Sequence, residues 1–162
     1  GSSNTSEFSA NISVGTALAV GSAATFWRAT GDAGALDTVP IDLQAYGIVP
    51  GQTIRLQQIG AFRNNPANPD NSTQMIAVFS STSTLLGPDI QARVSGAIKA
   101  GTDFVSAANS FGYATDIPED FEVTDISLLV PTGARYLFVQ ARDSRYGNND
   151  DPNGDYGIVI SR

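Results

Sequence analysis

The sequence predicts an all-β fold, an antiparallel β-sandwich or jelly roll of about eight to ten short strands. Its 16 acidic residues are 13 Asp and only three Glu, and it has a single Lys, whereas helical surfaces are usually rich in Glu and Lys. It also contains 16 Gly and eight Pro, and turn residues recur between short apolar runs. Several of these runs alternate between apolar and polar residues, which is the pattern of half-buried strands.

Four segments in the first half of the chain predict strands, namely residues 24–29, 38–43, 53–59 and 75–79. In the second of them Val39, Ile41 and Leu43 alternate with non-aliphatic neighbours, which predicts a half-buried strand. Pro40 favours a place at a sheet edge, because proline cannot donate a ladder hydrogen bond. Residues 49–52 carry Pro and Gly at the two central positions, which predicts a type II turn before the third strand.

Three further strands are predicted near the end of the chain, namely residues 126–130, 135–143 and 156–160. The stretch from 85 to 122 gives the weakest secondary-structure signal in the sequence. Residues 90–94 alternate and residues 104–105 suggest another strand, whereas residues 116–122 leave a short helix open. Residues 1–3 resemble an expression scar, and we expect residues 4–162 to form a single domain.

The composition excludes several classes of function. Without Cys the chain has no thiolate nucleophile and no Cys-based metal site, and without His it has no imidazole acid or base. The net charge of −7 disfavours nucleic acid as a partner, since a phosphate backbone calls for a basic face. No apolar run reaches the roughly 18 residues of a spanning helix, so we expect no membrane insertion. The metal ligands that remain are the oxygen atoms of the many Asp and Asn side chains, and such oxygen ligands suit Ca²⁺.

A polar loop at residues 143–155 concentrates these ligands. Its carboxylate and amide side chains are Asp143, Asn148, Asn149, Asp150, Asp151, Asn153 and Asp155. Four carboxylates on so short a loop repel one another unless water or a cation screens them, and Ca²⁺ takes six to eight oxygen ligands. The alternation of Asp151, Asn153 and Asp155 is typical of looped calcium sites, although no Glu follows at the position an EF-hand requires. The alternative is a solvated Asp/Asn-rich hairpin loop.

Two other groups of residues are candidates for ligand contacts. The loop at residues 63–73 offers Asn65, Asn68 and Asp70 for recognition, or it is an ordinary surface loop. Tyr146 could stack on a ligand ring, although such aromatic residues more often pack in a core. The acidic residues between 119 and 122 lie too close together in sequence to flank a scissile glycosidic bond from opposite sides.

The closing segment resembles a known family. Residues 146–149, Tyr-Gly-Asn-Asn, followed by residues 154–160, Gly-Asp-Tyr-Gly-Ile-Val-Ile, are similar to the C-terminal hairpin of the galactophilic calcium-dependent bacterial lectins of the PA-I type and of related β-sandwich domains in secreted bacterial proteins. Residues 48–54 are similar to the Pro-Gly turn of that family. The resemblance covers about half of the chain and implies a galactose-binding-like β-sandwich.

The resemblance also implies a set of calcium ligands. Asp143 would be the bridging acidic ligand, Asn148 and Asn149 would supply side-chain oxygens, and a backbone carbonyl near Ile48 would complete the shell. In that family hydroxyl groups of the sugar complete the coordination, so that calcium holds the ligand directly. Asp143 and Asn148 would then contact the sugar as well.

This sequence departs from the family at two places. The gap between Asp143 and Tyr146 is shorter than in the family, and residues 150–153 resemble an insertion, so Asp151 or Asn153 could take over a ligand role or help to bind a second ion. The sugar-contacting His of the family has no counterpart, and the loop at residues 63–73 occupies its place. Galactose specificity is therefore less well supported than calcium.

These observations lead to one main hypothesis and one alternative. The main hypothesis is a secreted, non-catalytic module that binds Ca²⁺ through residues 143–155 and uses it to hold a carbohydrate. The alternative is a structural or adhesive module, in which calcium only rigidifies the loop and the partner is a protein or a second copy of the chain in a homo-oligomer. An enzyme is the least favoured class, since only carboxylate chemistry would be left to it.

Overall fold

The computed structural model describes residues 15–101 and 117–162, and within them the protein is all-β. One short 3₁₀ helix, η1 (Leu43–Tyr46), accompanies the strands. The strands are β1 (Thr16–Ala19), β2 (Ala24–Thr25), β3 (Leu36–Asp37), β4 (Ile41–Asp42), β5 (Thr53–Ile59), β6 (Met75–Ser80), β7 (Ala97–Ile98), β8 (Phe121–Glu122), β9 (Asp125–Leu129), β10 (Tyr136–Ala141) and β11 (Gly157–Ser161).

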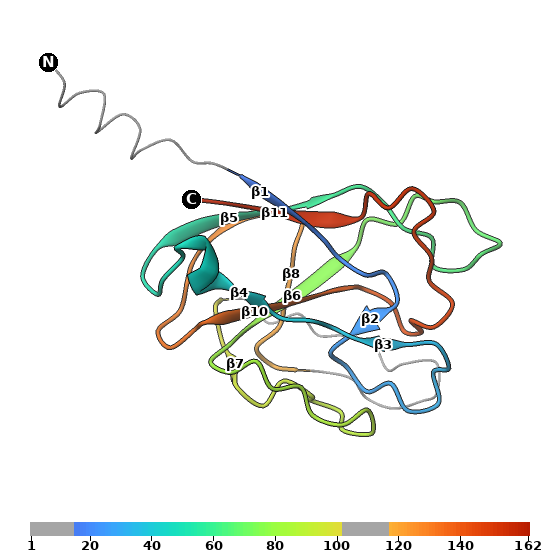
Figure 1. Cartoon of the computed structure of the whole chain (residues 1–162), viewed down its shortest axis with the longest axis horizontal. Coiled ribbons are helices and arrows are strands. Elements are labelled where there is room, and N and C mark those ends of the chain that lie inside the picture. The colour runs from blue at the N-terminus through green and yellow to red at the C-terminus, as the bar shows by residue number, and fades with distance from the viewer. Residues whose placement is uncertain (1–14, 102–116) are drawn as a thin grey trace, which may run out of the picture.

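Two antiparallel sheets pack against each other as a β-sandwich (Figure 1). The first has the strand order β1-β11-β5-β9. The second has the order β4-β10-β6-β7, and β8 pairs with β6 beside this path. The short β2 and β3 form a separate parallel pair. The predicted all-β sandwich is confirmed, whereas the jelly-roll connectivity stays a prediction.

The core lies between the two sheets and continues behind the second one. In β5 the buried residues Ile54 and Leu56 alternate with exposed ones, as expected of a strand with one covered face. All six residues of β6 are buried, because both faces of that strand are covered. On β10, Phe138 packs edge-to-face against Phe26, with ring centroids 6.4 Å apart. Segments between β1 and β4 therefore add a partial third layer to the sandwich.

The strongest sequence patterns predicted their elements best. Strand β5 has the predicted bounds, and β6, β9, β10 and β11 differ from theirs by one or two residues at either end. The turn before β5 is confirmed too, since Gly51 has a φ of +91°, a value that a type II turn requires at its third position. Glycine adopts that angle without the steric penalty of a side chain.

Three weaker predictions need correction. The strand predicted at residues 24–29 is only the two-residue β2, after which the buried Phe26 and Trp27 leave the sheet. Val39 is 86 % exposed, because the chain forms only the short edge strand β4 before it enters η1. Residues 90–94 form isolated bridges rather than a strand.

Residues 117–120 form a turn that leads into β8, so the helix left open at 116–122 is absent from its described part. The predicted strand at 104–105 lies outside the described residues. Within residues 15–101 and 117–162, no helix is long and apolar enough to cross a membrane.

Candidate functional site

Two connections between the sheets lie side by side at one end of the sandwich. One joins β5 to β6 through residues 60–74, and the other joins β10 to β11 through residues 142–156. The register explains their proximity, because Ile59 pairs with Gly157 in the first sheet and Met75 pairs with Ala141 in the second. A further segment, residues 20–35, reaches the same end after β1, and these loops gather at the right of Figure 1.

Asp143 follows the end of β10, where the chain leaves the second sheet. Its Oδ1 accepts a hydrogen bond of 2.7 Å from the backbone N–H of Ser144. Its Oδ2 is buried and has no hydrogen-bond partner among the residues that the structure describes. Burial raises the pKa of Asp143 above its ordinary value, although nearby N–H donors oppose that effect. The ionised form is thus short of favourable interactions within the protein itself.

Asn148 and Asn149 add two more unpartnered oxygens. Asn149 is 9 % exposed, and its Nδ2 donates to the carbonyl oxygen of Ser22 at 2.9 Å, which fixes the orientation of the amide. The Oδ1 atoms of both Asn148 and Asn149 are buried without a partner. An unsatisfied buried acceptor costs about 1–3 kcal/mol, so three of them within seven residues call for an external partner.

Asp32 holds this loop from a distance of more than a hundred residues in sequence. Its Oδ2 accepts from the backbone N–H of Tyr146 at 2.6 Å, and its Oδ1 accepts from that of Gly147 at 3.0 Å. The loop is closely packed here, because a Cβ on Gly147 would lie 1.9 Å from the carbonyl oxygen of Ala33. The sequence analysis missed Asp32, since no local pattern links it to the loop.

Tyr146 lies in the core rather than on a binding surface. It is 2 % exposed, and its hydroxyl donates to the carbonyl oxygen of Ala141 at 2.9 Å. That hydroxyl also accepts from the backbone N–H of Asp143 at 3.3 Å, while the ring packs edge-to-face on Trp27. Burial raises its pKa well above the ordinary value. The structure therefore makes Tyr146 a support for Asp143 and leaves its ring no open face on which a ligand could stack.

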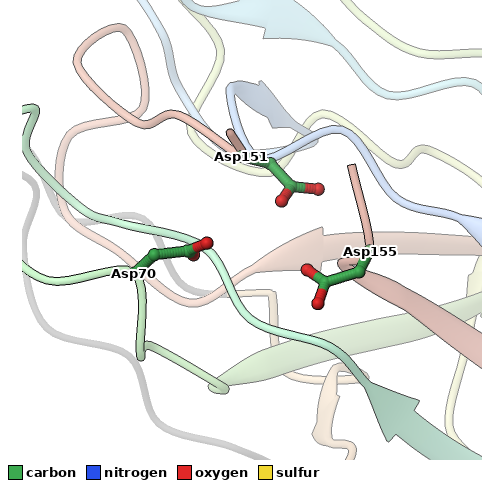
Figure 2. Close-up of side chains that lie close together, drawn as sticks. All are labelled: Asp70, Asp151 and Asp155. Carbon is green, nitrogen blue, oxygen red and sulfur yellow. The ribbon is translucent and has the colours of Figure 1, made fainter. Parts of the chain in front are cut away.

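The later part of the loop forms a separate acidic cluster with the neighbouring loop. One carboxylate oxygen each from Asp70, Asp151 and Asp155 lies within 4.8 Å of the others, and the three side chains turn toward one another in Figure 2. Asp151 accepts backbone hydrogen bonds from Gly154 and Tyr156, and Asn153 donates through Nδ2 to Asp70 at 2.7 Å.

Partial desolvation, together with the charges of Asp155 and Asp151, raises the pKa of Asp70. The predicted ligands of the 143–155 loop are therefore divided between two places. Asp143, Asn148 and Asn149 contribute the unpartnered oxygens of the first, whereas Asp151, Asn153 and Asp155 gather around Asp70 in the second.

The loop at residues 63–73 is tied to the 143–155 loop. Nε and Nη2 of Arg63 both donate to Oδ2 of Asp150, and the two residues also form a backbone bridge. Asn65 and Asn68 are exposed and make contacts within their own loop, where Asn68 donates to the side chain of Asn64 at 2.8 Å. It is Asn64, not Asn65 or Asn68, that lines a pocket together with Asp143.

Ile48 lies at the other end of the sandwich, which corrects the predicted ligand set. Its backbone N–H donates to the carbonyl oxygen of Leu43 in η1, and its side chain packs beside Ile160 and Arg162 at the end of β11. The loop that carries Asp143 precedes the start of β11, so β11 separates the two (Figure 1). The Pro-Gly turn was assigned to the wrong end because the sequence does not show which end of a strand a ligand must occupy.

The fold and the site together define an all-β sandwich whose loops at one end contain several buried oxygen atoms without a partner among the described residues. Comparisons with protein-family models, with curated proteins and with solved structures found no match for this chain.

Proposed function

We propose that this protein is a calcium-dependent carbohydrate-binding module without catalytic activity. One observation carries the proposal: Asp143 Oδ2, Asn148 Oδ1 and Asn149 Oδ1 are buried and unpartnered, and they come from one short loop. The rest of that loop is anchored by Asp32 and by the contact between Arg63 and Asp150. A loop held this firmly, with three acceptor atoms that no donor of the described residues reaches, is suited to a cation.

Calcium fits this set of oxygens better than other common metals. Its preferred ligands are carboxylate, amide and backbone oxygens at about 2.3–2.6 Å in irregular geometry, whereas zinc and copper favour nitrogen and sulfur. With no Cys and no His, the chain offers only oxygen ligands from its side chains for a metal of this class. A divalent cation beside Asp143 would also reverse the rise in its pKa, because an opposite charge favours the ionised form.

The carbohydrate part of the proposal follows from the number of ligands. Three side-chain oxygens fill at most half of the six to eight positions that calcium takes. Sugar hydroxyls are oxygen ligands that could occupy the open positions, and the resemblance to PA-I type lectins supports the same arrangement. Extracellular fluid is where a calcium site of this kind would be filled, so the proposal includes secretion.

A structural role for calcium has one observation in its favour. The cluster of Asp70, Asp151 and Asp155 joins the 63–73 loop to the 143–155 loop, so a cation there would hold the two together without touching a ligand (Figure 2). The protein would then be a calcium-stabilised structural or adhesive module that binds a protein or a second copy of itself.

Isothermal titration calorimetry on the whole chain separates these functions. Ca²⁺ is titrated first, and galactose, mannose, glucose and N-acetylglucosamine follow, each with excess Ca²⁺ and with EGTA. We expect saturable Ca²⁺ binding and sugar binding that EGTA abolishes. Absence of Ca²⁺ binding, or sugar binding that persists in EGTA, would contradict the mechanism. Ca²⁺ binding without any sugar binding would favour the structural role.

Three variants locate the ion. Asp143→Asn should weaken Ca²⁺ and sugar binding together, because it removes the only carboxylate among the three unpartnered oxygens. Asp155→Asn tests the second cluster and should leave sugar binding unchanged. Asp125→Asn is the matched control, since Asp125 forms an ion pair with Arg55 on the four-stranded sheet, away from both proposed cation sites. If Asp155→Asn removes the binding and Asp143→Asn does not, the ion belongs to the second cluster.

A further inference from the structure

A pocket of about 230 Å³ lies beside Asp143 and is bounded by three different parts of the chain. Its walls include Trp27 from the N-terminal segment, Phe62 and Asn64 from the loop after β5, and Ser72 from before β6. The pocket is smaller than the roughly 300–1,000 Å³ of pockets for drug-sized ligands, so it suits a single small ring.

Trp27 is the unusual residue in this wall. It is 2 % exposed, and its indole N–H is buried and donates to no acceptor within residues 15–101 and 117–162. Buried indole N–H groups usually have a partner, because leaving a donor unpaired costs about 1–3 kcal/mol. The unpaired donor is thus a second signal at this end of the molecule, opposite in kind to the unpaired acceptors of the loop.

The position of Trp27 is fixed by its backbone and by its ring. Its N–H donates to Thr25 Oγ1 at 3.0 Å, and its carbonyl oxygen accepts from Arg93 Nη1 at 3.1 Å. The ring lies edge-to-face with Tyr146, at a centroid distance of 6.2 Å, and Tyr146 in turn supports Asp143. A donor held this rigidly loses little conformational entropy when a ligand binds.

We propose that the indole N–H of Trp27 is a specificity-determining donor, which gives its hydrogen bond to an oxygen of a monosaccharide bound in this pocket. The lining matches that class of ligand, because it combines two aromatic residues with amide and hydroxyl side chains, while Arg142 and Asp143 add a charged donor and a charged acceptor for hydroxyl groups. The inference rests on the proposed function for the identity of the ligand. It adds Trp27 as the residue that hydrogen-bonds to one oxygen of that sugar.

The single Trp of the chain makes a direct test possible. In the ¹⁵N-labelled protein the indole group gives one N–H resonance, which can be followed during titration with galactose, mannose, glucose and N-acetylglucosamine in excess Ca²⁺. We expect at least one sugar to shift this resonance downfield in a saturable manner and to slow its exchange with solvent. If none of them moves it, the inference is overturned.

A variant and a set of deoxy sugars distinguish hydrogen bonding from shape. Trp27→Phe keeps an aromatic ring and removes the donor, so sugar affinity should fall roughly tenfold while Ca²⁺ affinity is unchanged. One monodeoxy sugar lacks the oxygen that accepts this hydrogen bond. The wild type should bind this deoxy sugar roughly tenfold more weakly than the parent sugar. Trp27→Phe should bind the deoxy sugar and the parent sugar with equal affinity. Tyr46→Phe, at the other end of the sandwich, is the control.

The two proposals fail in different ways. If every deoxy sugar loses as much affinity for Trp27→Phe as for the wild type, Trp27 contributes only shape and this inference falls. Sugar binding that shifts the indole resonance equally in EGTA would overturn the calcium mechanism and leave Trp27 in place. If Trp27→Phe does not fold, as judged by circular dichroism, the titration of the wild-type resonance decides alone.

Discussion

Two charged side chains at the same end of the molecule have opposite surroundings. Arg93 is fully buried, and its guanidinium donates to the carbonyl oxygens of Leu86, Thr25 and Trp27 and to the carboxylate of Asp37. Asp143 is only partly buried, yet one of its oxygens has no partner.

The comparison teaches how to separate structural from functional polar groups. The protein itself satisfies Arg93, so this residue organises the segment that covers the second sheet. Among the described residues it satisfies only one of the two carboxylate oxygens of Asp143, because Oδ1 accepts from Ser144 and Oδ2 has no partner. Burial of a charge therefore says less about function than the presence of an unmet hydrogen bond.

The largest effect on stability is expected at Arg93, whose charged group is hydrogen-bonded by the protein itself. Arg93→Met should lower the free energy of unfolding by about 3 kcal/mol or more, because it leaves buried carbonyl oxygens without donors. Urea denaturation followed by circular dichroism measures this loss. A loss below about 1 kcal/mol would mean that the buried network has little structural value, and the comparison would fail.

A smaller effect is expected from filling the calcium site. Ca²⁺ at one hundred times its dissociation constant should raise the free energy of unfolding by about 2.7 kcal/mol in the wild type. Asp143→Asn should abolish that gain, whereas Arg93→Met should keep it. Thermal melts with Ca²⁺ or EGTA make the measurement, and an equal gain in Asp143→Asn would show that Asp143 is not a ligand.

The pH dependence of that gain tests the sign of the electrostatics. Because the folded pKa of Asp143 is raised above its ordinary value, its contribution in EGTA favours folding at low pH and is lost as the pH rises through the folded pKa. Ca²⁺ binds the ionised form, so the gain from Ca²⁺ should grow as the pH rises and disappear at acidic pH, where Asp143 is protonated. Melts at a series of pH values check this trend, and a gain independent of pH would contradict it.

The smallest effect is expected at an exposed ion pair. Arg55 on β5 forms an ion pair with Asp125 on the neighbouring strand β9, and its guanidinium lowers the pKa of that carboxyl group. Asp125→Asn should lower the free energy of unfolding only slightly, since both side chains are about half exposed and solvent screens their attraction. The difference from wild type in urea denaturation should shrink in high salt and should not depend on Ca²⁺.

Local patterns predicted the local parts of this fold. The alternation in residues 53–59 and the apolar run in residues 75–79 are strong enough to define β5 and β6. The pattern at 90–94 was misleading because Arg93 points inward against its apparent polarity, where carbonyl oxygens receive it. Val39 was predicted to be half-buried, but the alternation of Val39, Ile41 and Leu43 does not show whether another element covers that face of the strand.

The site was predictable only where it lies on one segment. The density of Asp and Asn predicted the loop that contains Asp143, Asn148 and Asn149. Asp32 carries no local signal, because it reaches the loop through the fold across more than a hundred residues. Ile48 was placed wrongly for the related reason that register, not sequence spacing, decides which loops meet.

The position of β11 has a consequence for how the chain folds. This last strand lies between β1 and β5, so the four-stranded sheet joins residues separated by nearly the whole length of the chain. Such non-local pairing carries a large loop-closure cost and makes refolding slow. A chain that stops before residue 157 cannot build this sheet. The loop that carries Asp143 is then attached to a strand at only one of its two ends, that of β10.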